Sequence, residues 1–449
     1  MLKIFVVGIM ALVFISTLFW PWIGGITYIV MSVLSPQNIW FWGFEDIRSS
    51  YVIVLAIATS SIIHLLLGNI SLSVWKSKQN VLVLFIWIMI ICSYFFGAYP
   101  PNTLGSNNMN SDLLLRRYSI VFVMYFMIQP LITELKIISR LIWGLVLVFG
   151  FYTYWANYQY ISGEMFQRGV SLTGPSFSGG SGNYTDENTL AMLFVMAIPF
   201  FYYLGQENRN KFIKIALYLL IPFAWHSVFL TGSRGGLVGL AAITLHMVIR
   251  TPKKIYAVLL VIGLVMAFIY QSGDYMKHRA STISRYEEES SAQQRIEAWT
   301  MASRMCKDHP LLGVGLGNFT VAWEKYSSST PRVAHSSIIE LAAENGVLAG
   351  LAFAVIFVLS WLDLRNIRRK AMEIHGFDDQ RASKILSIVN ALEGACFGYF
   401  VCGLFLSLGS YEIFYFIIMI VVSLRWNIAS TNSSGGTGVN SIEFSPQMV

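Results

Sequence analysis

The sequence predicts an all-α, polytopic membrane protein with about 12 transmembrane helices and a large loop that carries surface helices. Its 449 residues are 55% hydrophobic and only 12% charged, whereas about a quarter of the residues in soluble domains are charged. The mean hydropathy is +0.59. Apolar runs of the length that crosses about 30 Å of hydrocarbon recur along the chain, and a soluble protein would need polar surfaces in their place.

The expected spans begin with an ambiguous segment, residues 4–34, which can form one tilted helix with an interfacial extension or two short helices broken near Pro21. No small-x-small cleavage site follows it, so we expect a retained anchor that crosses once. The further spans are predicted at residues 51–68, 80–99, 118–132, 141–161, 188–205, 212–231, 235–250, 255–272, 347–364, 391–409 and 411–426.

Basic residues set the orientation of these spans. If the spans alternate, the cations gather on one side, which the positive-inside rule assigns to the cytoplasm together with both termini. The cations are Lys76, Lys78, Lys136, Arg140, Arg209, Lys211, Lys214, Arg250, Lys253, Lys254 and those of the segment 365–384. The opposite side then carries residues 162–187, the turn at 231–235 and the large loop 273–336.

This reading divides the chain into four parts. Residues 1–272 form a bundle of about nine transmembrane helices, and residues 273–336 form the large outer loop. Residues 337–428 form the C-terminal transmembrane helices. The Ser/Gly/Asn-rich tail, residues 429–449, has no apolar periodicity and is expected to be disordered.

Two arginines on the outer side are candidate anion ligands. Arg168 lies in a Gly/Ser-rich segment, either as a solvated charge in a linker or as an anion contact at the mouth of a cavity. Arg234 follows Ser233 between two apolar runs, where an arginine either snorkels to the interface or faces a watery cavity. A guanidinium matches phosphate oxygens bidentately, and Ser233 with the free N–H groups of a helix start also suits an anion.

The large loop is expected to contain an amphipathic helix that lies along the membrane surface, with Arg295 turned toward a cavity. The stretch Ser291–Gln294 resembles a capping box at its start, and the Asp308-His309-Pro310 sequence ends it. The apolar face is predicted to hold Ile296, Trp299, Ala302, Ser303 and Cys306. The following GxGxG run, residues 313–317, is better explained as a turn than as a nucleotide site, because no strand–helix context surrounds it.

His335 stands where the outer loop ends, and a neutral imidazole there can accept a proton from a hydroxyl group. Glu340 and Glu344 follow in a helical start, near enough to orient or charge-balance such a site; the alternative is a surface histidine beside a helix cap. The four cysteines and seven histidines show no metal spacing, so we expect no metal ion and no cofactor. The arginines would hold a diphosphate leaving group while His335 activates an acceptor hydroxyl.

In this order, the motifs resemble the O-antigen ligase/polymerase superfamily, over roughly residues 20–410. An early stretch, residues 35–44, resembles its exosortase-associated O-glycosylation ligase branch. The motifs that carry the resemblance are Arg168-Gly169, Asp186–Ala191, Ser233–Gly236, Arg295 to Phe319, His335-Ser336 and Glu344–Gly346. Two positions depart from the family pattern, Val238 after the Ser-Arg-Gly motif and Ala349-Gly350 after the histidine, and both bear on helix packing more than on chemistry.

The resemblance implies an inverting, metal-independent glycosyltransferase of lipopolysaccharide biosynthesis in the bacterial cell inner membrane. Its donor would be an undecaprenyl-diphosphate-linked glycan, its expected acceptor lipid A–core, and its active site would face the periplasm among membrane lipids. Neither a cofactor nor a nucleic-acid partner is implied. The resemblance assigns catalysis to His335, diphosphate binding to Arg168 and Arg234, and a less defined role to Arg295, which we place with the diphosphate ligands; Ser233, Glu340 and Glu344 support them.

Two alternatives stay open. The same chemistry with another acceptor would make the chain an O-antigen polymerase or a protein O-oligosaccharyltransferase. A transporter or flippase of lipid-linked or anionic solutes would instead place charges at midplane depth and show internal repeats. The candidate charges gather on one face and no clear repeat is present, which favours an enzyme.

Overall fold

The computed structural model describes residues 2–44, 49–103, 110–163, 167–168, 171–172, 174, 184, 186–250, 262, 266, 290–374 and 379–434. These residues are almost entirely helical, apart from a short antiparallel hairpin of β1 (Gln167–Arg168) and β2 (Ser171–Leu172). The all-α fold class is therefore confirmed.

Within the described ranges, eight helices are long and apolar enough to cross a membrane. They are α5 (Ser49–Leu66), α6 (Lys78–Phe96), α8 (Leu135–Ser162), α9 (Glu187–Glu207), α10 (Lys211–Thr231), α17 (Val347–Ile374), α18 (Asp379–Gly403) and α19 (Glu412–Ser434). Two further predicted spans correspond to α7 (Ser111–Ile128) and α11 (Arg234–Arg250). The predicted span at 255–272 lies outside the described residues, except for two positions. The protein is a polytopic membrane protein, and the total of about 12 stays a prediction.

The N-terminal segment forms two helices, the second of the two alternatives, because the chain breaks at Trp20. Helix α1 (Leu2–Phe19) ends there and α2 (Pro21–Leu34) begins at a proline, whose missing N–H and fixed φ suit a first helical position. A Cβ atom at Gly24 would lie 2.5 Å from the Thr17 side chain and 2.8 Å from that of Ile57. Glycine thus lets α1, α2 and α5 pack closely.

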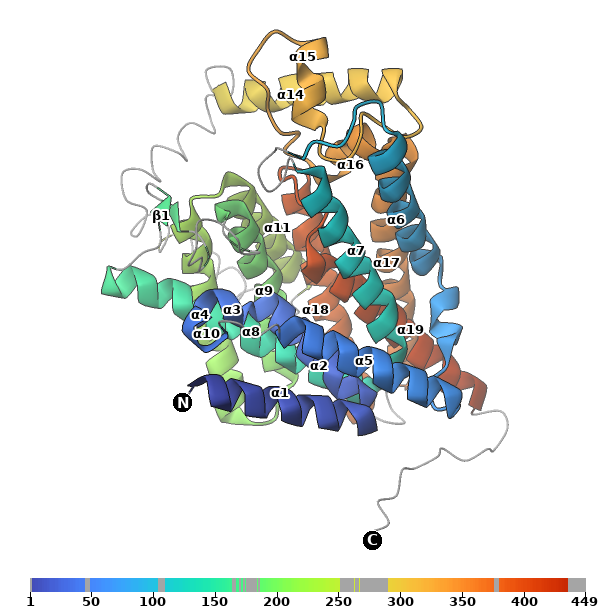
Figure 1. Cartoon of the computed structure of the whole chain (residues 1–449). Coiled ribbons are helices and arrows are strands. Elements are labelled where there is room, and N and C mark those ends of the chain that lie inside the picture. Colours follow the sequence, from blue (N-terminus) through green and yellow to red (C-terminus); the bar gives the residue numbers. More distant parts are fainter. Residues whose placement is uncertain are drawn as a thin grey trace.

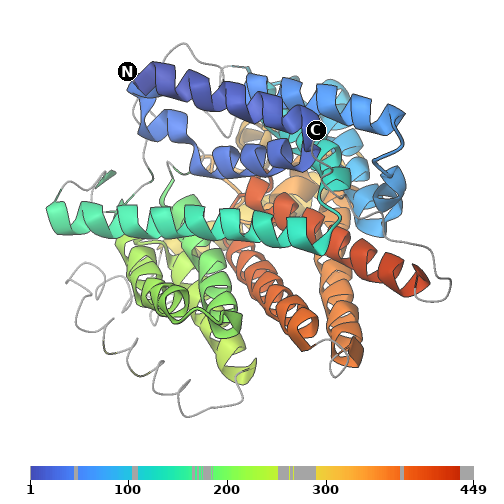
Figure 2. The ribbon, with the colours of Figure 1, turned by 90° about the horizontal axis from the view of Figure 1, so that it is seen from below.

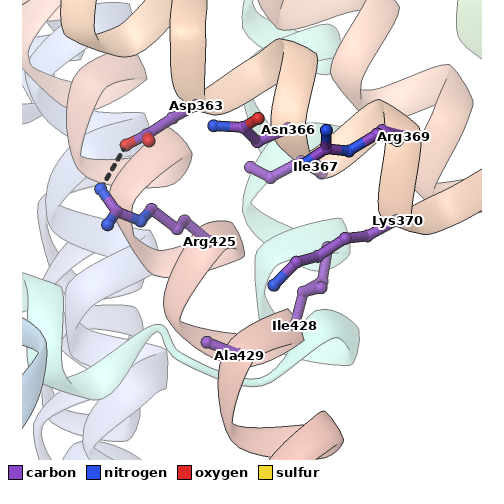
Figure 3. A pocket seen from close by; sticks show the side chains of 8 residues that line it. All are labelled: Asp363, Asn366, Ile367, Arg369, Lys370, Arg425, Ile428 and Ala429. Carbon is purple, nitrogen blue, oxygen red and sulfur yellow. Dashed lines mark hydrogen bonds and ion pairs between the residues drawn. The ribbon is translucent and has the colours of Figure 1, made fainter.

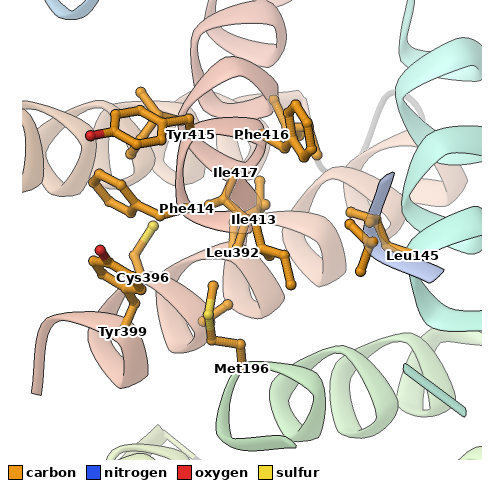
Figure 4. Close-up of a cluster of buried hydrophobic side chains, with 14 of the residues drawn as sticks. Leu145, Met196, Leu392, Cys396, Tyr399, Ile413, Phe414, Tyr415, Phe416 and Ile417 are labelled. Carbon is orange, nitrogen blue, oxygen red and sulfur yellow. The ribbon is translucent and has the colours of Figure 1, made fainter. Parts of the chain in front are cut away.

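The helices are arranged around α9, which is the most deeply buried of the candidate spans and lies against α8, α10, α11 and α18. Figure 2 shows α1, α2 and α5 side by side along one side of the molecule, with α8 between them and the helices of the other side. Figure 4 shows where four helices meet: Leu145 of α8, Met196 of α9, Cys396 of α18 and Phe414 of α19 share one apolar cluster. This core fixes the central helices on which the outer segments rest.

Short elements connect the bundle. They are α3 (Pro36–Ile39), α4 (Phe41–Phe44), and the 3₁₀ turns η1 (Leu72–Lys76) and η2 (Gln129–Leu131).

The described part of the large loop forms a cap over the end of the bundle where α6 ends and α17 begins (Figure 1). It contains α14 (Ser290–Asp308) and α15 (Phe319–Tyr326), and α16 (Ser337–Asn345) follows it. The three helices share a small core of their own, separate from that of the bundle, which includes Trp323 and Ala343.

Helix α14 is amphipathic and ends at Asp308 as predicted, but its predicted apolar face is only partly right: Ala302 is buried and Trp299 and Cys306 are half-buried, whereas two other predicted members are not buried. Ala298, Met301, Ala302 and Met305 are buried, whereas Ile296 and Ser303 are exposed. The face is rotated because α14 packs against α15 and α16, which the sequence pattern did not reveal. The helix begins where the capping box was predicted, but Ser291 is its second residue and therefore not the N-cap.

Two boundaries near the C-terminus also differ from the predictions. Helix α18 ends at Gly403 rather than at 409, which leaves residues 404–411 as a connecting segment that we call the α18–α19 loop. Helix α19 continues to Ser434, so residues 429–434 are helical rather than disordered. The prediction for residues 435–449 lies outside the described residues.

Candidate functional site

Ser233 closes the turn between α10 and α11 and places Arg234 at the first position of α11. Its hydroxyl accepts the backbone N–H of Gly236 (3.1 Å) and donates to Oδ1 of Asn188 in α9 (2.7 Å). The first contact caps α11, as a serine does at this position. The second joins the start of α11, where Arg234 lies, to the start of α9.

Glycines after Arg234 allow this close approach. A Cβ atom at Gly236 would lie 2.6 Å from the Cβ of Ala191, and one at Gly239 would lie 2.2 Å from the Sγ of Cys402. At Gly235 the nearest neighbour would be the Leu406 side chain, 3.2 Å away. The Ser-Arg-Gly-Gly motif therefore inserts α11 between α9 and the end of α18.

His335 lies just before α16 in a left-handed backbone conformation (φ +48°) that side chains other than glycine rarely adopt. The preceding carbonyl, that of Ala334, accepts the indole N–H of Trp299 at 3.0 Å. Trp299 and Arg295 are four residues apart on α14 and share one face. The tryptophan contact thereby brings the face of α14 that carries Arg295 over the His335 segment.

Charges around His335 favour its neutral form. Burial lowers the pKa of the His335 imidazole, the nearby Arg295 cation lowers it further, and the Asp186 carboxylate raises it. Asp186 is the N-cap of α9, where its Oδ1 accepts the N–H groups of Asn188 (2.9 Å) and Thr189 (3.1 Å). A half-buried imidazole that is neutral near pH 7 has a free lone pair for a proton.

The α18–α19 loop connects these elements. The Ser337 hydroxyl donates to the carbonyl oxygen of Leu406 (2.8 Å) and accepts the N–H of Leu408 (3.0 Å). The Arg295 guanidinium lies over the Phe405 ring, 5.9 Å from its centroid. Because Leu406 also lies where a Cβ atom at Gly235 would meet it, one loop lies beside the start of α11, the inward face of α14 and the start of α16.

Glu340 and Glu344 lie one turn apart on α16, in poorly solvated surroundings. Burial raises the pKa of Glu340 to about 7, against a smaller lowering effect of the Ser407 hydroxyl. Burial and the neighbouring Glu340 carboxylate raise the pKa of Glu344 well above its ordinary value. Oε1 of Glu344 also accepts the backbone N–H of Phe319 at 3.2 Å, so this side chain fastens the large loop to α16.

The GxGxG run forms turns that fit between α16 and the end of α6. Its glycines have positive φ angles of +69°, +108° and +74° at Gly313, Gly315 and Gly317. The N–H of Val314 donates to the carbonyl of Ala343 (2.9 Å), and the carbonyl of Val314 accepts the N–H of Tyr99 (3.0 Å). The run therefore positions the outer cap on the bundle.

We expect Gly313→Ala to destabilise the protein more than Gly68→Ala. Both glycines have nearly equal φ angles, +69° and +74°, so the backbone strain is matched. A Cβ atom at Gly313 would lie 2.3 Å from the backbone of Glu344, whereas none of the described atoms lies within 4 Å of one at Gly68. The clash should cost about 1–3 kcal/mol more. Thermal unfolding in detergent measures the difference, and equal midpoints would contradict this packing.

Of the remaining predicted groups, Arg168 lies in β1, where its backbone pairs with Ser171, but its side chain is outside the described residues. The hairpin strand β2 lies against α10. Across the described ranges, no group of three histidine, cysteine, aspartate or glutamate side chains is placed to hold a metal ion.

The sequence prediction gave no role in the site to Asp186 and Asn188, which it quoted only as part of a motif, and it missed Phe405. An Asp two to three residues before a predicted apolar helix is an N-cap signal, and it could have located Asp186 and Asn188 at a helix start. Phe405 has no comparable signal, because it lies in an apolar run that reads as the continuation of a transmembrane helix.

Comparison with known proteins links part of the chain to a family model. No curated protein matches the chain. Residues 215–354 match the family model described as O-antigen ligase, a range that includes Ser233, Arg234, Arg295, His335, Glu340 and Glu344, whereas Arg168, Asp186 and Phe405 lie outside it. The match supports a lipid-linked glycan transferase in general. The resemblance of this membrane protein to the O-antigen ligase superfamily is thus confirmed over residues 215–354.

Proposed function

We propose that this protein is an inverting glycosyltransferase that moves a glycan from undecaprenyl diphosphate to an acceptor hydroxyl. The observation that carries the proposal is the convergence of three motifs on the α18–α19 loop. Gly235, next to Arg234, lies beside Leu406 of this loop, Arg295 lies over its Phe405 ring, and Ser337, two residues after His335, hydrogen-bonds its backbone. All three motifs lie within the O-antigen ligase match.

In the proposed reaction, the acceptor hydroxyl attacks the anomeric carbon of the donor from the side opposite the diphosphate. A new carbon–oxygen bond forms, the bond to the diphosphate oxygen breaks, and the anomeric configuration inverts. His335 takes the hydroxyl proton through its free imidazole nitrogen, and the electron pair of the broken bond leaves with undecaprenyl diphosphate.

Arg234 and Arg295 bind the leaving group in this proposal. Charge develops on the diphosphate as the bond breaks, and fixed guanidinium groups in poorly solvated surroundings stabilise it more than water does. Arg234 lies at the N-terminus of α11, where backbone N–H groups add to the positive potential. Arg168 is proposed as a third ligand, contributed by the segment between α8 and α9.

The site would face the periplasm of the bacterial inner membrane, with both termini in the cytoplasm. The basic residues near Lys136, Arg250 and Arg368 follow the positive-inside rule in that orientation. We propose lipid A–core as the acceptor; a protein hydroxyl or a growing glycan would use the same chemistry.

The acceptor is tested with purified protein, an undecaprenyl-diphosphate-linked glycan and three acceptors offered separately: lipid A–core, an unfolded Ser/Thr-rich protein and a second donor molecule. Mass spectrometry of the products is expected to show glycan joined to lipid A–core. Transfer only to the second donor molecule would make the protein a polymerase, and transfer only to the protein would make it a protein O-oligosaccharyltransferase.

We expect the pH profile of kcat/KM to report the pKa of His335. Because burial and Arg295 lower its pKa, the acid limb should have its midpoint below the ordinary histidine value of about 6.5. Arg295→Gln removes a charge that lowers the pKa, so the limb should move to higher pH. Asp186→Asn removes a charge that raises it, so the limb should move to lower pH, while asparagine still caps α9.

Arg304→Gln is the matched control for these shifts. Arg304 lies on the same helix, α14, but its Nη1 donates to the carbonyl of Tyr326 at the end of α15 (3.1 Å), and it is not among the groups that shift the pKa of His335. The acid limb of the pH profile of Arg304→Gln should coincide with that of the unmodified protein. Shifts of Arg295→Gln and Asp186→Asn in the same direction would contradict the assignment.

A further inference from the structure

A cavity of about 300 Å³ lies between the last turns of α17 and α19, at the end of the bundle opposite the outer cap. Asp363, Asn366, Ile367 and Lys370 recur at helical spacing along one side of α17, with Arg369 beside them. Arg425 and Ile428 face them from α19 (Figure 3). The lining of the cavity begins at Asp363, 16 residues beyond Val347, the first residue of α17, so about 24 Å of helix separates the cavity from the outer end of α17.

A buried carboxylate organises this cavity. Oδ2 of Asp363 accepts Nη1 of Arg425 (2.9 Å) and Nε2 of Gln79 from α6 (2.6 Å). Asp363 is only 7% exposed, and a charge this poorly solvated persists when it is paired and hydrogen-bonded. The contacts hold the Arg425 guanidinium at the edge of the cavity in one orientation.

Two further cations enter the same cavity without a matching anion. Among the residues that the structure describes, Arg369 and Lys370 have no ion-pair or hydrogen-bond partner. The neighbouring cations of α17 are already engaged. Arg368 pairs with the buried Glu393 and donates to Asn390, and Arg365 lies over the Trp361 ring at 5.5 Å. Three cations therefore face one carboxylate, which leaves an excess positive charge inside a defined hollow.

The surroundings of the cavity are those of a membrane interface. Trp426, next to Arg425, donates its indole N–H to Oγ of Ser73 in η1 (3.0 Å), and Trp75 of the same turn donates to the carbonyl of Phe126 (3.1 Å). Tryptophan is enriched where hydrocarbon meets water. The apolar side chains of Ile367 and Ile428 also line the cavity. A ligand here would contact both charged and apolar groups.

We propose that this cavity binds the phosphate-containing headgroup of an anionic phospholipid. Arg369, Lys370 and Arg425 would contact the phosphate, Asn366 would donate to it through its amide, and the isoleucines would meet the glycerol end of the acyl chains. A basic cavity between helices at the predicted cytoplasmic surface has the chemistry for such headgroups. The size is at the lower end of small-molecule sites, about 300–1,000 Å³. The proposal is independent of the transfer reaction.

Native mass spectrometry of the full-length protein in detergent tests this site, with phosphatidylglycerol and phosphatidylethanolamine titrated separately. The double variant Arg369→Gln/Lys370→Gln is expected to bind phosphatidylglycerol about 10- to 30-fold more weakly, because each basic residue near an anionic surface contributes about a factor of five. Arg365→Gln, the control for the single variant Lys370→Gln, removes one positive charge from the same helix outside the cavity and should bind like the unmodified protein. Lys370→Glu, which places a carboxylate in the cavity, should weaken binding further than Lys370→Gln.

Three outcomes would overturn the proposal. The double variant and Lys370→Glu could bind phosphatidylglycerol as tightly as the unmodified protein, or phosphatidylethanolamine could bind equally well. Inorganic phosphate could displace the lipid at equal concentration, which would assign the cavity to a soluble anion instead. Unfolding temperatures without added lipid check that each variant is folded.

Discussion

Replacing His335 with asparagine is expected to reduce glycan transfer at least about 10²-fold while the protein still folds, since general-base catalysis contributes about 10²–10⁴-fold. His335 adopts φ +48°, and asparagine tolerates this left-handed conformation better than most side chains. The variant therefore keeps the backbone and loses only the imidazole. Initial rates of product formation with purified protein measure the loss.

Glycine at the same position gives a second measurement. His335→Gly fits the positive φ without strain and leaves space where the imidazole was, so added imidazole should restore part of the rate. His64→Asn in α5 is the control, because that ring contacts the carbonyl of Leu18 at 3.1 Å, on a different part of the bundle. Transfer by His335→Asn at the unmodified rate would remove His335 from the catalytic step.

The second large loss of activity is expected when Arg234 is replaced. Arg234→Ala is expected to lower kcat/KM by about 10²–10³, the loss typical when one electrostatic contact to the developing charge is removed. Arg234→Lys should recover little of it, since an ammonium group cannot bind two phosphate oxygens in the planar geometry of a guanidinium. Steady-state kinetics with an undecaprenyl-diphosphate-linked donor measure both variants.

A matched exchange separates this effect from a general sensitivity to arginine replacement. Arg140 in α8 lies over the Trp22 ring at 4.5 Å, far along the chain from the proposed site, and Arg140→Lys should keep nearly full activity. Equal activity of the arginine and lysine proteins at position 234 would argue against bidentate recognition of the diphosphate.

The fold class and several helix boundaries could be predicted because they depend on local composition. Helices α9 and α10 begin and end within a few residues of the predicted spans, and α14 ends at Asp308 before His309-Pro310 as expected. The length of an apolar run and the residues that end a helix can both be recognised in a short stretch of sequence. They can therefore be predicted without knowing which other helices pack against it.

Features that depend on partners could not be predicted. The buried face of α14 is set by α15 and α16, and the end of α18 at Gly403 follows from the contacts of the α18–α19 loop with Ser337. The sequence does not indicate the end of α18 at Gly403, because Phe405 and Leu406 are as apolar as the helix before them. For the same reason, the sequence could name Arg234, Arg295 and His335 as candidates but not the loop that joins their segments.

The glycines near Arg234 have two roles, one in the proposed binding site and one in helix packing. The glycines after Arg234 stand next to a proposed diphosphate ligand, yet Gly236 and Gly239 are required where α11 meets Ala191 and Cys402. Packing thereby determines where Arg234 lies, and a larger residue at either position would displace it. The glycine spacing after Arg234 is thus required for the packing of α11 as well as for the proposed binding of the diphosphate.

The central claim, that the protein forms a glycosidic bond rather than moving its lipid-linked substrate intact, is tested most directly by product stoichiometry in proteoliposomes. With an undecaprenyl-diphosphate-linked glycan and lipid A–core present, we predict one undecaprenyl diphosphate released for each glycan joined to the acceptor, with the same yield after EDTA treatment. Movement of intact donor across the bilayer without release of undecaprenyl diphosphate would contradict this account and identify a transporter.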